Sequence, residues 1–135
     1  MSMPDRRPVL VVDDDPDVVA LAVRVLDRDG WRVVATTDPR EAAALAVKER
    51  PFLAIVDLMM PHLDGEELVH ELRRALGEQA PKVVVASAAY ARADISQRLG
   101  AEASLDKPFD IDDLRDVVAR FGDGHRDPSV PPRSR

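Results

Sequence analysis

Five short apolar runs alternate with five helical patterns along this chain, and this alternation constrains the fold more than any other feature. The runs are of strand length and lie at 8–12, 31–36, 52–56, 82–86 and 102–105. The helical patterns follow them at 16–29, 39–50, 65–76, 88–99 and 111–121. Strands that alternate with helices indicate a parallel sheet with helices on both faces. We therefore expect an α/β fold, a single doubly wound (βα)5 flavodoxin-like domain with strand order 2-1-3-4-5.

Signals at the helix ends support this pattern. Asp15 and Asp38 each precede a proline, and an N-cap acid before a proline is a strong helix start. Asp64 and Asp110 are expected to cap two later helices in the same way. The helical pattern at 88–99 is the weakest of the five, since only every fourth residue there is apolar and in register.

Composition limits the classes of protein to which the chain could belong. The formal net charge of −6 argues against direct binding to nucleic acid or to an anionic membrane. The chain has no cysteine, which excludes disulfides and thiolate metal sites, and no apolar run is long enough to span a membrane. We expect a soluble cytoplasmic domain at 8–121, a disordered N-terminal segment at 1–7, and a disordered tail or linker at 122–135.

Polar residues follow four of the predicted strands, at the sheet edge where ligands bind in open α/β folds. They are Asp13 and Asp14, Asp57, Ser87 and Lys107. Carboxylates packed together repel one another unless a cation compensates, and Mg²⁺ takes carboxylate and carbonyl oxygens while leaving room for a phosphate oxygen. A lysine and a hydroxyl can stabilise an arriving oxyanion. The set is therefore suited to accepting a phosphoryl group on Asp57 as an aspartyl phosphate.

Each of these residues also has an ordinary structural interpretation. The acids at 13–15 could cap a helix, Asp57 could be a turn residue, Ser87 a small strand-end residue and Lys107 a surface lysine. Capping requires one acid and does not explain three, so the coincidence at four strand ends favours a site. No histidine has a second ligand at metal spacing, and we expect all three to be solvated: His62, His70 and His125.

The motifs VLVVDDDPDV, IVDLMMPHLDG, VVVAS and LDKPF resemble, in order and spacing, the receiver domain of two-component response regulators. The resemblance covers about 8–121. It implies phosphotransfer to Asp57 from a sensor histidine kinase or a histidine phosphotransfer protein. It also implies a set of residues that hold Mg²⁺, namely Asp13, Asp14, the Asp57 side chain and the Met59 carbonyl. Lys107 would pair with the phosphoryl group, and Ser87 would be the switch hydroxyl that moves toward it.

One position departs from the family pattern. Three residues before Lys107 the family usually carries Tyr or Phe, whose ring turns inward when the hydroxyl moves, but this chain has Ser104. Tyr90 is the nearest aromatic residue that could substitute, although it could equally be a half-exposed loop ring. We expect the signal to pass mainly through the loop at 87–91 and the weakly amphipathic helix that follows it.

The sequence leaves the output open. About a dozen residues follow the last helix, too few for an effector domain, so we expect phosphorylation-dependent protein binding. The alternatives are a phosphorelay intermediate or a receiver cut from a larger protein. The downstream partner is not indicated, and the charged last helix could form a homodimer, although a solvated face is its default.

Two other classes compete with the receiver interpretation. A phosphatase of the haloacid dehalogenase type normally has a second Asp two residues after the nucleophile, where Met59 stands. A pseudo-receiver that is not phosphorylated is favoured by Ser104 alone. We therefore expect no enzyme activity beyond self-phosphorylation and slow autodephosphorylation, because neither Met59 nor Ala89 can position a water.

Overall fold

The computed structural model describes residues 6–59, 64–87, 97–122 and 124–130. Its strands are β1 (Val9–Val12), β2 (Val33–Thr36), β3 (Leu53–Asp57), β4 (Lys82–Ser87) and β5 (Ala103–Asp106). They form one parallel sheet of order β2-β1-β3-β4-β5. Its α-helices are α1 (Pro16–Arg28), α2 (Ala42–Glu49), α3 (Gly65–Leu76) and α5 (Ile111–Phe121). The expected fold class and strand order are confirmed.

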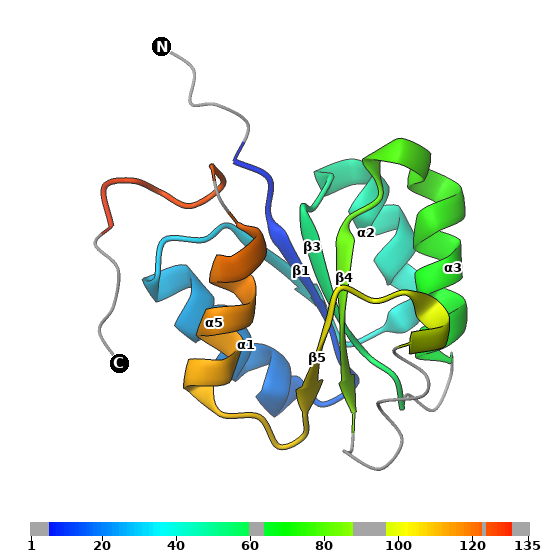
Figure 1. Cartoon of the computed structure of the whole chain (residues 1–135), viewed down its shortest axis with the longest axis horizontal. Helices are drawn as coiled ribbons and strands as arrows, with labels where there is room; N and C mark the ends of the chain where they lie inside the picture. The colour runs from blue at the N-terminus through cyan, green and yellow to red at the C-terminus, as the bar shows by residue number, and fades with distance from the viewer. Residues whose placement is uncertain (1–5, 60–63, 88–96, 123, 131–135) are drawn as a thin grey trace.

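The helices cover both faces of the sheet, with α1 and α5 on one side and α2 and α3 on the other (Figure 1). Alternate side chains of β1 pack into the two helix layers on opposite faces of the sheet. Val9 and Val11 pack with α1 and α5, whereas Leu10 and Val12 pack with α2 and α3. Because both faces are covered, the central strands are continuous apolar runs, as is typical of parallel sheets.

Side-chain caps begin the helices where the sequence predicts them. Asp15, Asp64 and Asp110 each accept a hydrogen bond from the backbone N–H two residues on, at 2.9, 2.9 and 3.2 Å. The segment after Asp38 differs from the expected helix, because its first turn is a 3₁₀ helix (Pro39–Glu41) and α2 begins at Ala42. On α3 the buried face includes Val69 and leaves Ala75 exposed.

The fourth predicted helix lies mostly outside the described residues. Within the described part, 97–99 are helical and Gly100 has a positive φ of 64°. Leu99 is buried in the layer formed by α2 and α3, as its place in the apolar pattern predicts. Tyr90, Ala89 and His62 lie outside the described residues. No helix among the residues described has the length and apolar character needed to cross a membrane.

Residues near both chain ends make contacts that the sequence does not predict. The His125 ring stacks on Phe52 with centroids 4.6 Å apart, and its Nδ1 accepts a hydrogen bond from the Arg7 N–H at 3.2 Å. Asp127 donates its N–H to the Gly30 carbonyl at 2.9 Å. The composition of 122–135 predicts a disordered tail. Composition cannot predict a single ring contact such as that of His125 with Phe52. His125 is therefore partly buried rather than solvated as expected.

Candidate functional site

Four strand ends meet at one edge of the sheet, because β1, β3, β4 and β5 are consecutive neighbours. Asp13 follows β1, Asp57 ends β3, Ser87 ends β4 and Lys107 follows β5. The Lys107 Nζ lies 2.8 Å from the Asp13 Oδ2 and 3.2 Å from the Asp57 Oδ2. One ammonium group therefore bridges two carboxylates that are about 45 residues apart in the chain.

Asp57 is fixed by burial and by a hydrogen bond from the backbone. Its side chain is almost fully buried, with 3% of the residue exposed, and its Oδ1 accepts a hydrogen bond from the Met59 N–H at 3.0 Å. Met59 itself is 62% exposed, at the rim of the site.

The first residue of α3 packs against the backbone of Asp57. A Cβ on Gly65 would lie 2.5 Å from the Asp57 carbonyl oxygen and 2.7 Å from the Leu58 Cα. Only glycine lets the start of α3 come this close to the end of β3. The sequence predicts a helix that Asp64 caps, but the contact of Gly65 with Asp57 was not predicted, although an Asp-Gly pair after a strand was the available signal.

Three carboxylates form an acidic cluster at this edge. One oxygen each of Asp13, Asp14 and Asp57 lies within 4.8 Å of the others, with Asp14 exposed and the other two buried. Asp13 is oriented by the Asp15 N–H, which donates to its Oδ1 at 2.9 Å. A set of hard oxygen donors with one face open to solvent fits the ligand preference of Mg²⁺.

Burial and like charge make the electrostatics of the site unusual. Burial raises the pKa of Asp57, and the Asp13 carboxylate adds to this, while the Met59 N–H and Lys107 act in the opposite direction. Burial alone would lower the pKa of Lys107, but its contacts with Asp13 and Asp57 raise it above the ordinary value. Lys107 therefore stays charged and compensates for the two buried acids.

Ser87 presents a buried hydroxyl to the same edge. The residue is 1% exposed, and its Oγ has no hydrogen-bond partner within the described part of the chain. Its carbonyl accepts a hydrogen bond from the Lys107 N–H at 2.9 Å, which ties β4 to the segment carrying the lysine. Leaving a buried hydroxyl unpartnered costs on the order of 1–3 kcal/mol, so the Ser87 Oγ is a polar group whose hydrogen bond is not met by the described residues.

Ser104 lies on β5, where it pairs with Val85 of β4 and is partly buried. It lines a cavity of about 390 Å³ together with Asp113, Asp116 and Arg120 of α5. The structure thus places Ser104 beside α5, and Tyr90, its suggested substitute, lies outside the described residues.

Comparisons with known proteins agree on one family. Residues 9–119 match the family model described as response regulator receiver domain. Sporulation initiation phosphotransferase F of Bacillus subtilis is 30% identical over 116 residues, covering 84% of this chain and 91% of the relative. Response regulator MprA of Mycolicibacterium vanbaalenii is 38% identical over 111 residues, which are 78% of this chain and 46% of MprA. This chain thus spans about half the length of MprA.

Solved structures agree with these relatives. The signal receiver domain of a response regulator from Bermanella marisrubri superimposes with a TM-score of 0.77 at 34% identity, covering 85% of this chain and 97% of that chain. The chemotaxis protein CheY4 of Vibrio cholerae has a TM-score of 0.76 at 28% identity, covering 84% and 97%.

Asp57→Asn should stabilise the protein at neutral pH when no divalent metal is present. Because its pKa is raised above 3.8 in the folded state, Asp57 favours folding below that pH, and this contribution is lost as the pH rises through the raised pKa. At pH 7 the variant should have a higher free energy of unfolding than the wild type, since Lys107 keeps Asp13 as a partner.

Urea unfolding in EDTA at pH 7 and pH 4 measures this difference, and the gain should shrink at pH 4. Asp14→Asn is the matched control, because Asp14 is exposed and its substitution should change stability by less than about 0.5 kcal/mol. A variant at position 57 that is less stable than wild type at pH 7 would contradict this account.

Proposed function

The chain belongs to the response regulator receiver domain family of two-component systems, and we propose that Asp57 is the residue that accepts the phosphoryl group. One observation carries the assignment: the Lys107 Nζ lies within 3.2 Å of both Asp13 and Asp57, at the sheet edge where β4 ends in Ser87, whose buried hydroxyl has no hydrogen-bond partner among the described residues. An ammonium group beside a buried carboxylate supplies positive charge to a phosphoryl group, and a hydroxyl at the same sheet edge can donate a hydrogen bond to it.

In the proposed reaction an Asp57 carboxylate oxygen attacks phosphorus in the phosphohistidine of the donor. The new oxygen–phosphorus bond forms as the phosphorus–nitrogen bond breaks, and the imidazole leaves with the electron pair and takes up a proton. The Met59 N–H fixes the orientation of the attacking carboxylate. Lys107 then neutralises charge on the phosphoryl oxygens, and the Ser87 hydroxyl donates to one of them.

The acidic cluster is the proposed Mg²⁺ site. The side chains of Asp13, Asp14 and Asp57 and the Met59 carbonyl would hold the ion, and the clustering of the three carboxylates within 4.8 Å supports this. When bound, Mg²⁺ offsets repulsion between the carboxylates and the phosphoryl oxygens.

The domain itself is proposed to act as a phosphoacceptor and not as an enzyme with turnover. Receiver domains are generally non-enzymatic, and they interact with histidine kinases or histidine phosphotransfer proteins. We infer that one of these donates to residues 8–121 in the cytoplasm, and that the output is protein binding. The exposed Met59, where a phosphatase would carry a general acid, supports this reading.

Incubation with acetyl phosphate and Mg²⁺ should add one phosphoryl group to the wild-type chain, as measured by intact mass spectrometry. Asp57→Asn should abolish the mass gain, because the amide is a poor nucleophile. Asp27→Asn removes an exposed acid on α1 and should leave the gain unchanged. A mass gain that persists in the Asp57→Asn variant would place the phosphoryl group on another residue.

The signal is proposed to leave the site through Ser87 and the residues after it, since Ser104 has no ring to turn inward. Phosphorylation should shift amide resonances across 87–105 in heteronuclear NMR spectra. Ser87→Ala should reduce these shifts while Asp57 is still phosphorylated, because the hydroxyl that follows the phosphoryl group is gone. Ser104→Ala serves as the control and should change them little. An unshifted 87–105 region would rule out this route.

The aspartyl phosphate should be long-lived with Mg²⁺ present, because the thioether of Met59 cannot orient an attacking water. Met59→Asp should shorten the lifetime by on the order of tenfold by adding a group that can. Met59→Leu is the matched control and should leave the lifetime close to that of wild type. Decay of the wild-type phosphoprotein within seconds, followed by mass spectrometry, would contradict this expectation.

A further inference from the structure

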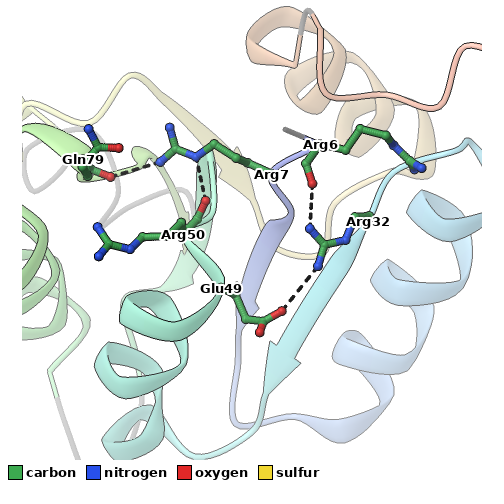
Figure 2. Close-up of a pocket in the computed structure, with 6 residues that line it drawn as sticks. All are labelled: Arg6, Arg7, Arg32, Glu49, Arg50 and Gln79. Carbon is green, nitrogen blue, oxygen red and sulfur yellow. Dashed lines mark hydrogen bonds and ion pairs between the residues drawn. The ribbon is translucent and has the colours of Figure 1, made fainter. Parts of the chain in front are cut away.

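A second cavity, of about 450 Å³, lies at the amino ends of the strands, the sheet edge opposite Asp57 (Figure 2). Its lining residues come from the segment before β1, the segment before β2, the end of α2 and the turn before β4. They are Arg6, Arg7, Arg32, Glu49, Arg50 and Gln79. We propose that this arginine cavity binds a phosphate-type dianion, either free phosphate or the phosphate group of a small organic molecule.

Arg7 is fixed in the wall of the arginine cavity by neutral acceptors. Its Nε donates to the Arg50 carbonyl at 2.7 Å, and its Nη2 donates to the carbonyls of Pro51 and Gln79, each at 3.2 Å. All three acceptors are backbone carbonyls, so they hold the guanidinium group without cancelling its charge. A cation that is already ordered loses little further entropy when an anion binds.

The acids near the cavity do not balance its arginines. Arg32 donates to the Arg6 carbonyl at 2.7 Å and reaches Glu49 at 3.5 Å, and nearly half of the Arg32 side chain is exposed (Figure 2). The Arg6 guanidinium group turns away toward Gly30 and the tail residue Asp127. The rest of the lining then carries three arginines (Arg7, Arg32 and Arg50) and the single acid Glu49, which leaves an excess of two positive charges in a chain whose net charge is −6.

Arg50 has a backbone conformation that glycine adopts more easily than other residues. It caps the end of α2 with a φ of 54°, the one positive φ among the described non-glycine residues. That left-handed conformation is unfavourable for a residue with a Cβ. A cation at a helix C-terminus also complements the helix dipole, but that role would account for Arg50 and not for Arg7.

The chemistry of the lining defines the class of ligand. Guanidinium groups bind phosphate and carboxylate oxygens in pairs of parallel hydrogen bonds. The excess of two charges favours a dianion over a monocarboxylate, and the volume falls within the range of small-molecule pockets. The Arg50 guanidinium makes no hydrogen bond or ion pair within the described part of the chain, so its fork is available to a ligand.

An NMR titration with sodium phosphate tests the proposal, with EDTA present and the ionic strength held constant with NaCl. Saturable amide shifts are expected around residues 32, 50 and 79. Glycerol 2-phosphate tests for an organic phosphate, and tighter binding than inorganic phosphate would identify that source. Acetate should bind more weakly than either. Shifts confined to the surroundings of Asp57 and Lys107, or no saturation, would overturn the proposal.

Variants separate a defined site from general charge. Arg50→Gln should weaken phosphate binding by at least about fivefold, and Arg50→Lys should weaken it by less because it keeps the charge without the fork. Lys48→Gln removes an exposed positive charge from the same helix, outside the cavity, and should change binding by less than about twofold. Equal losses of phosphate affinity in Arg50→Gln and Lys48→Gln would overturn the proposal, because binding would then depend on net charge alone. Urea unfolding of each variant confirms that the fold is kept.

Discussion

The contact of one lysine with two buried acids is the constraint on which this structure depends. Asp13 and Asp57 end neighbouring strands, and their carboxylates could not both be buried without a nearby positive charge. Lys107 supplies that charge from beyond β5, two strands away from β3. The strand order therefore does more than bury the apolar runs, because it brings this lysine to the acids. A β5 placed elsewhere in the sheet would take Lys107 away from both carboxylates.

The sequence predicts this end of the molecule well because its signals are local. A buried strand that stops at a polar residue marks both the strand and the residue, and it did so at Asp13, Asp57 and Ser87. N-cap acids mark helix starts in the same way, as at Asp15 and Asp110. Parallel pairing then brings the strand ends together without further information. Family resemblance adds the roles of these residues, which periodicity alone cannot assign.

The opposite end is poorly predicted because its contacts are distant in sequence and use backbone acceptors. Arg7 meets carbonyls at 50, 51 and 79, and His125 stacks on Phe52. No periodic pattern marks such pairs, since any arginine can donate to any carbonyl within reach. The Gly65 contact with Asp57 was missed for a related reason: an Asp-Gly pair indicates a turn, but the close approach is a property of the packed helix. Composition likewise gives no indication that Asp127 and His125 in the tail form hydrogen bonds with the domain.

The two ends of the sheet satisfy polar groups in opposite ways. At the carboxyl end, backbone N–H groups of Asp15 and Met59 donate to carboxylates, so negative side chains lie against partly positive backbone. At the amino end, guanidinium groups donate to backbone carbonyls, so positive side chains lie against partly negative backbone. In each case the backbone dipole orders a charge without neutralising it. A cation is then the natural complement of the first edge, and an anion that of the second.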